Sequence, residues 1–174
     1  MGKIKVQNLI APSLLSDKHK VDNFDCGEAS LNDWLKKRAS KNNASDASRC
    51  FVICDKNNEV VGYYSLSAGA ISRGSAPKSM QRNMPDSLPV LVLGRLAIDR
   101  IYHNKGLGSA LLRDAMIRSV SIAQNAGVFA ILIHSLSDKA KQFYLSRGFV
   151  ESPLQSMTLF MTLATIRVIL AEDK

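Results

Sequence analysis

The chain reads, from Val90 to Ser109, Val-Leu-Val-Leu-Gly-Arg-Leu-Ala-Ile-Asp-Arg-Ile-Tyr-His-Asn-Lys-Gly-Leu-Gly-Ser. The apolar first half predicts a buried strand over Leu91 to Asp99, and the second half predicts a glycine loop that opens a helix. Gly106 and Gly108 have no Cβ, so the peptide N–H groups of the loop can approach an anion closely, and the helix N-terminus adds partial positive charge. This order of elements predicts a cradle for a phosphate-bearing cofactor.

The helix after the loop is indicated by apolar residues at helical spacing, namely Leu107, Leu111, Ala115 and Ile122. Two glycines are a weak motif by themselves, and an ordinary loop-to-helix turn also explains them. The segment is not a Walker loop, because no Gly-Lys-Ser/Thr follows, and it lacks the third glycine of a dinucleotide-binding fingerprint. The segment that follows therefore decides between these interpretations.

That segment contains a second buried strand, Ala130 to His134, and then a helix from about Asp138 to Arg147 within which Phe-Tyr-Leu-Ser-Arg-Gly-Phe begins at Phe143. Together with the loop His-Asn-Lys-Gly-Leu-Gly, it resembles motifs A and B of the GNAT superfamily of acetyl-CoA-dependent N-acetyltransferases. His103 replaces the usual Gln or Arg, and Asn104 stands where glycine is frequent, although Asn tolerates positive φ. The resemblance implies an α/β (α+β) GNAT fold, with a mixed, mostly antiparallel central sheet that is splayed at the acetyl-CoA site and flanked by helices.

The resemblance implies acetyl-CoA as the cofactor. Peptide groups of the first strand would pair with its pantetheine arm, and one N–H would polarise the thioester carbonyl. The alternative for this strand is an ordinary buried central strand. The implied cofactor contacts are Leu96, Ala97, Ile98, His103, Asn104, Lys105, Gly106, Leu107, Gly108, Ser109, Ser135, Lys139, Ala140 and Phe143.

Tyr144 is the candidate catalytic residue. A phenol with an unperturbed pKa near 10 stays protonated at neutral pH and can donate a proton to the leaving thiolate. By resemblance, Tyr144 occupies the general-acid position. The alternative is an amphipathic tyrosine that packs between helix and sheet with its hydroxyl at the surface.

No general base is obvious in the sequence. The candidate carboxylates are Glu28, Asp46, Asp99 and Asp138, for which a surface or capping role is the simpler interpretation. For His134 too, the simpler interpretation is a histidine at the end of a strand whose ring nitrogens have hydrogen-bond partners. An α-amine, with a reference pKa near 8, needs less help from a base than a lysine ε-amine near 10.4.

Segments outside the two motifs resemble the toxin branch of the superfamily. They are Phe24 to Glu28 leading into Leu31, Ala47 to Phe51, Val61 to Ser65, Arg82 to Pro85, Pro89 to Asp99 and His134 to Asp138, with similarity from about Leu14 to about Leu170. These toxins belong to bacterial toxin–antitoxin systems with ribbon-helix-helix antitoxins. The resemblance implies acetylation of the α-amine of the amino acid on charged tRNA, which blocks translation. It also implies a homodimer, an antitoxin partner, and contact with DNA only through the antitoxin complex.

Charge agrees with a polyanionic substrate. The chain has 23 Lys and Arg against 15 Asp and Glu, a formal net charge of +8, which favours nucleic acid and disfavours polycationic amines. The candidate tRNA contacts are Lys36, Arg73, Lys78, Arg82 and Arg95, although lysines on a polar helix face are also explained by solvation. Arg95 differs, since an arginine within an apolar strand needs a partner. The alternative functions are acetylation of a small amine or protein amino group, and a non-catalytic cofactor-binding or DNA-bound regulator.

Composition predicts one domain over residues 1–174, since 174 residues with 46% hydrophobic content suit a single core. No signal peptide and no apolar run of membrane-spanning length is evident, so a cytoplasmic protein without membrane contact is expected. Cys50 and Cys54 read as buried free thiols, and no metal site is predicted.

The remaining chain predicts further elements. They are a strand over Lys3 to Gln7, a helix from Glu28 to about Lys41 with a capping box at Asp25 and Glu28, a hairpin of Phe51 to Asp55 and Glu59 to Ser67, and a last strand over Thr158 to Thr162.

Overall fold

The computed structural model describes residues 8–174. Its strands are β1 (Leu9–Leu14), β2 (Arg49–Asp55), β3 (Val60–Ser72), β4 (Ser87–Ile98), β5 (Ala130–His134), β6 (Val150–Glu151) and β7 (Thr158–Thr162). Its α-helices are α1 (Ala29–Lys37), α2 (Ala39–Ala44), α3 (Leu107–Ala123), α4 (Asp138–Leu145) and α5 (Leu163–Glu172). Short 3-10 turns occur at η2 (Arg73–Ser75), η3 (Lys78–Met80) and η4 (Arg100–Tyr102).

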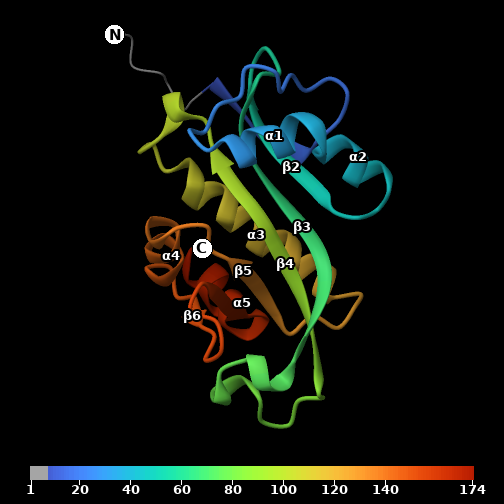
Figure 1. The fold of residues 1–174 in the computed structure, drawn as a ribbon, viewed down its shortest axis with the longest axis vertical. Coiled ribbons are helices and arrows are strands. Elements are labelled where there is room, and N and C mark those ends of the chain that lie inside the picture. The colour runs from blue at the N-terminus through green and yellow to red at the C-terminus, as the bar shows by residue number, and fades with distance from the viewer. Residues whose placement is uncertain (1–7) are drawn as a thin grey trace. The chain divides into compact units, whose positions relative to one another are not determined.

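The strands are hydrogen-bonded in the order β1-β2-β3-β4-β5-β7-β6. β4 and β5 are parallel, whereas the pairs β1–β2, β2–β3, β5–β7 and β6–β7 are antiparallel. Figure 1 shows β3 and β4 as long neighbouring strands. This mixed, mostly antiparallel sheet with helices confirms the predicted fold class.

The structure falls into two compact units, each described by itself below. Unit 1 contains the chain up to Ser67 together with Arg95–Ala115, and unit 2 contains Ala68–Gly94 together with Met116–Lys174. The strands β3 and β4 and the helix α3 begin in one unit and end in the other. The expectation of a single domain over the whole chain stays a prediction.

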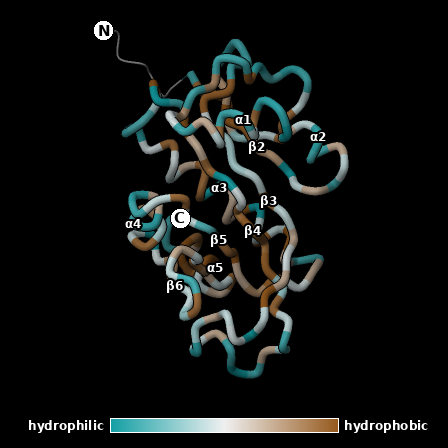
Figure 2. Tube along the Cα trace, in the orientation of Figure 1, coloured by the Kyte–Doolittle hydropathy of each residue, from teal (hydrophilic) through white to brown (hydrophobic). Residues whose placement is uncertain are grey.

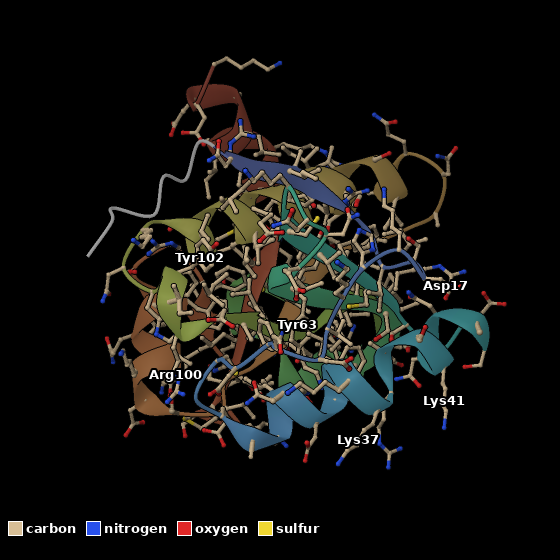
Figure 3. The ribbon with its side chains drawn as sticks, turned by 90° about the horizontal axis from the view of Figure 1, so that it is seen from above. Asp17, Lys37, Lys41, Tyr63, Arg100 and Tyr102 are labelled. Carbon is tan, nitrogen blue, oxygen red and sulfur yellow. The ribbon has the colours of Figure 1, made fainter. Side chains whose placement is uncertain are left out.

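Three aromatic side chains pack together in the core of unit 1. The Tyr63 ring stacks on Trp34 at 5.7 Å between centroids and meets the edge of Phe24 at 5.6 Å. All three side chains are buried, and the Tyr63 hydroxyl donates to the Leu31 carbonyl of α1 at 2.7 Å. In Figure 3, Tyr63 lies inside the unit, while Lys37 points away from it. The apolar residues of α1 therefore face the core of unit 1, and its lysines face solvent.

The approach of α3 to the sheet in unit 1 depends on a glycine. A Cβ at Gly62 of β3 would lie 2.7 Å from Ile98 Cδ1 and 3.1 Å from Leu111 Cδ1. Leu111 and Ala115 are fully buried on the sheet side of α3. Because no side chain fits at Gly62, the helix that follows the glycine loop packs directly on β3.

Unit 2 has its own apolar core around β5. The buried residues Val90, Ala130, Leu132 and Phe160 form a cluster, and Figure 2 shows apolar residues along β4 and β5 and hydrophilic residues around α4. The helix α5 contacts β7. Its Thr162 side chain caps the N-terminus of α5 by accepting from the Thr165 N–H at 3.1 Å.

Several sequence expectations hold. The bounds of β5 and β7 match the predicted Ala130 to His134 and Thr158 to Thr162, and β2 and β3 form the predicted hairpin. Cys50 and Cys54 are buried free thiols, and burial raises the pKa of Cys50 to about 12. The strand predicted over Lys3 to Gln7 lies outside the described residues.

Other expectations are wrong. The helix predicted from Glu28 to Lys41 is broken at Arg38, which has φ −125° and ψ −30°. The capping box does not form, because Glu28 makes no side-chain cap and the Asp25 carboxylate accepts instead from the Gly27 N–H and the Asn32 side chain, each at 2.9 Å. The strands β1 and β6 and the helix α5 were not predicted.

Within the described range, every helix falls short of the length and apolar character needed to cross a bilayer.

Candidate active site

The glycine loop in unit 1 has the backbone of an anion cradle. Asn104 and Gly106 both have positive φ, 60° and 80°, so the chain curls sharply before α3 begins at Leu107. A Cβ built on Gly106 would meet nothing within 4 Å, which leaves its surface open within the unit. The N-terminus of the 17-residue helix α3 carries the partial positive charge of the helix dipole. The loop fits a pyrophosphate group.

Hydrogen bonds fix this loop to the end of β4. The Asp99 carboxylate is buried and accepts from the N–H groups of Ile101 and Asp25, both at 3.0 Å. The His103 ring donates from Nε2 to the Ile98 carbonyl at 2.7 Å. Arg100, labelled in Figure 3, forms an ion pair with Asp25. The loop is therefore preorganised, and the His103 ring helps to fix its conformation by its hydrogen bond to β4.

The end of β4 carries the predicted strand contacts. The register pairs of β4 with β5 run from Val90 to Leu93, and β4 itself continues to Ile98. Ala97 is buried in the core of unit 1, whereas Leu96 and Ile98 are half-buried. Contacts made here would come from peptide groups, because apolar side chains occupy the core.

In unit 2, a buried hydroxyl stands before α4. Ser135 Oγ is buried and has no hydrogen-bond partner among residues 8–174, while its N–H donates to the Met157 carbonyl at 2.8 Å. The Ser135 hydroxyl therefore has a donor and an acceptor position that a bound group can use. The Ser137 side chain caps α4 by accepting from the Ala140 N–H at 3.1 Å. Lys139 is exposed and Phe143 is half-buried on the same helix.

Tyr144 of α4 is 7% exposed. Its ring meets Phe143 and Phe149 edge to face, at 5.1 and 5.6 Å between centroids. Burial raises the pKa of the Tyr144 phenol above its ordinary value. No hydrogen bond of this hydroxyl occurs within the described part of the chain. The phenol stays protonated at any physiological pH and is a proton donor.

Two of the candidate carboxylate bases have structural roles, since Asp99 anchors the loop and Asp46 pairs with Arg49 at 2.6 Å. Glu28 stands at the N-cap of α1 without a side-chain cap, and Asp138 lies in the first turn of α4. Sequence reasoning missed two residues next to His134, Thr158 and Gln155. The His134 Nδ1 lies 2.9 Å from Thr158 Oγ1, which in turn donates to Gln155 Oε1 at 3.0 Å.

The predicted basic contacts are distributed over both units. Lys36 in unit 1 and Lys78 and Arg82 in unit 2 are exposed. Arg73 pairs with Asp86 at 3.0 Å, within the β3–β4 connection. Arg95 has the partner that its position in an apolar strand requires, because its guanidinium lies 4.4 Å from the Trp34 ring centroid.

No cluster of three or more metal-ligating side chains occurs between residues 8 and 174.

Comparison with known proteins agrees with these features. Residues 46–151 match the acetyltransferase (GNAT) domain family. A "tRNA-acetylating toxin" from Mycobacterium tuberculosis is 43% identical over 93% of this chain and 97% of its own length. A "probable toxin TacT" from Sinorhizobium fredii is 29% identical over 87% of this chain and 89% of its own.

Solved structures also resemble the fold. A tyrosine-to-phenylalanine variant of KacT superposes with a TM-score of 0.89 at 29% identity, covering 94% of this chain and 99% of that one. AtaT in complex with acetyl-methionyl-tRNAfMet superposes with a TM-score of 0.87 at 30% identity, covering 93% and 99%. The chain belongs to the GNAT acetyltransferase family, and within it to the branch that contains these toxins.

Proposed function

We propose that this protein transfers the acetyl group of acetyl-CoA to the α-amine of the amino acid on charged tRNA, and so blocks translation. The observation that carries the proposal is the 43% identity, over 93% of the chain, to a tRNA-acetylating toxin. The AtaT complex with an acetylated aminoacyl-tRNA supports the same substrate class, and a structure of AtaTR bound with AcCoA supports the cofactor.

Residues of both units have features that suit acetyl-CoA. The loop from His103 to Ser109 offers backbone N–H groups and the positive end of α3 to the pyrophosphate. The peptide groups of Leu96, Ala97 and Ile98 pair with the pantetheine arm, and the orphaned Ser135 hydroxyl gains a partner. Lys139, Ala140 and Phe143 complete the contacts. Bound acetyl-CoA supplies an activated acyl group, which an amine can accept.

The chain assists the transfer by stabilising charge. A β4 N–H donates to the carbonyl oxygen as negative charge develops on it. Tyr144 donates its phenolic proton to the departing sulfur, and its raised pKa keeps that proton in place until it is needed. The apolar rings of Phe143 and Phe149 hold the phenol in position.

The net charge of +8 suits a tRNA backbone. Lys36, Lys78 and Arg82 are exposed for phosphate contacts, and Arg73 and Arg95 contribute to the same attraction. Charged tRNA as substrate places the activity in the cytoplasm. Structures of AtaT with the C-terminus of antitoxin AtaR, and of AtaT-AtaR with DNA, support an antitoxin as partner and DNA contact within that complex. That the antitoxin is of the ribbon-helix-helix class, and that DNA is contacted through it alone, is what the sequence resemblance implies. The homodimer that the sequence resemblance implies is part of the same proposal.

The test is transfer of labelled acetate from acetyl-CoA to purified aminoacyl-tRNAs, with free polyamines, aminoglycosides and peptide amino termini in parallel. We expect label on aminoacyl-tRNA, lost when the ester bond to tRNA is hydrolysed before the reaction. Label on small amines or peptides alone would refute the tRNA proposal and support the alternative acceptors.

A further inference from the structure

A cavity of about 220 Å³ lies in unit 2. Its apolar wall is made by Ile71, Leu132 and Phe160, and its polar wall includes His134, Gln155 and Thr158. Pockets for drug-sized ligands measure roughly 300–1,000 Å³, so this cavity is suited to one small group and not to a coenzyme. His134 is the only imidazole among the side chains that line it.

The hydrogen bonds of this wall determine the tautomer of His134. The Thr158 hydroxyl has a single hydrogen, which it donates to Gln155 Oε1 at 3.0 Å. Its oxygen must therefore accept from His134 Nδ1–H, at 2.9 Å. Nδ1 carries the proton in the neutral ring, and the lone pair is left on Nε2. No partner of Nε2 is found among the described residues.

The position of the ring suits proton transfer better than support of the core. His134 ends β5 after four buried apolar residues and is itself exposed, whereas Thr158 behind it is 5% exposed. The two residues face each other in the β5–β7 register. A ring that lines a cavity, with Nδ1 held by a buried hydroxyl and Nε2 left without a protein partner among the described residues, is an oriented base.

We propose that His134 Nε2 takes the proton of the aminoacyl α-ammonium group, with Thr158 and Gln155 as positioning residues and the amino-acid side chain in the cavity. This inference rests on the proposed function. An N–H bond of the ammonium breaks and an Nε2–H bond forms, and the proton passes on to water. The freed nitrogen lone pair forms the bond to the acetyl carbon, while the electrons of the carbon–sulfur bond leave with the sulfur, which takes the Tyr144 proton. The nitrogen then loses its second proton, which restores the phenol through solvent.

The first test compares kcat of His134→Gln with wild type at two pH values. Glutamine retains an amide that can reach Thr158, but it is no base. With an α-amine pKa of about 7.8, roughly 14% of the substrate is neutral at pH 7.0 and about 90% at pH 8.8. We therefore expect His134→Gln to lose about 7-fold in kcat at pH 7.0 and less than about 2-fold at pH 8.8. An unchanged kcat at pH 7.0, or an equal loss at both pH values, would overturn the proposal.

The second test keeps His134 and changes its support. Thr158→Val removes the acceptor for Nδ1–H, and Thr158→Ser keeps it. We expect the valine variant to lose kcat at pH 7.0 with little change in KM, and the serine variant to retain most of it. Equal losses in the two variants would contradict the positioning role. If wild type acetylates no aminoacyl-tRNA, the proposed function fails; if wild type is active and both tests fail, only the inference on His134 fails.

Discussion

Substitution of Gly106 by alanine separates backbone strain from ligand binding. The glycine has φ +80°, and an added Cβ would meet nothing within 4 Å. The folded protein therefore suffers only the cost of a left-handed L-residue, roughly 1–2 kcal/mol. For a chain of this size, that corresponds to a fall in Tm of about 2–8 °C.

The same methyl group would stand where a pyrophosphate approaches the loop. Loss of one charge-assisted N–H bond to the phosphate is worth roughly 1.5–3 kcal/mol, so we expect the Kd for acetyl-CoA to rise about 10- to 150-fold. Isothermal titration calorimetry with acetyl-CoA and thermal unfolding without it measure the two effects separately.

Gly148→Ala is the matched control. Gly148 has φ +98°, and a Cβ there would lie 3.5 Å from Met161 Cε, an ordinary contact. Its strain is comparable, but the residue has no assigned contact with the cofactor. We expect a similar fall in Tm and an unchanged Kd. If Gly106→Ala binds acetyl-CoA as tightly as Gly148→Ala, the loop is not the pyrophosphate cradle.

Four other predictions follow from the structure. Tyr144→Phe should lower kcat by about 10²- to 10⁴-fold and leave the Kd for acetyl-CoA unchanged, as measured by steady-state kinetics and calorimetry; unchanged turnover would exclude the acid role. Gly62→Ala should reduce the free energy of unfolding by about 1–3 kcal/mol, measured in urea, because its Cβ would lie 2.7 Å from Ile98 Cδ1; an unaltered midpoint would show that the contact relaxes freely. The free energy of unfolding should decline above about pH 10. In the unfolded chain Tyr144 ionises near its reference pKa, whereas burial raises the pKa of Tyr144 in the folded protein. The unfolding midpoint of Tyr144→Phe should therefore decline less over the same pH range. Combined Lys78→Ala and Arg82→Ala should raise KM for aminoacyl-tRNA and flatten its salt dependence, whereas an unchanged salt slope would remove these residues from the tRNA surface.

The sequence predicted elements best where one local pattern decides them. The run from Ala130 to His134 is apolar and short, so β5 was located to the residue. The break at Arg38 carries no glycine or proline signal, and the buried Ala39 of α2 belongs to the same apolar cluster as Trp34 and Leu35 of α1. The helix α5, from Leu163 to Glu172, was missed since its apolar content lacks a clear polar face.

For the candidate site, the backbone of the glycine loop was predictable from the sequence. Glycines with a helix behind them identified the loop, because Gly106 must adopt positive φ. The contacts of His134 were not predictable, since Thr158 and Gln155 reach it only through the pairing of β5 with β7, 24 residues apart along the chain. Long-range pairs of this kind leave no periodic signal in the sequence.

The choice of an imidazole as the proposed base has a chemical consequence. Asp99 holds the glycine loop and Asp46 holds Arg49, whereas His134 is oriented by Thr158 at the cavity. At pH 7 a lysine ε-amine is about 0.04% neutral and an α-amine about 14%, a ratio of roughly 350. A weak base is sufficient to deprotonate the α-amine, but it is not sufficient for the lysine ε-amine. We therefore expect a peptide that offers both amines to be acetylated, if at all, at its N-terminus by two orders of magnitude over its lysine, as mass spectrometry of the product would report; preference for lysine would require a stronger base than His134.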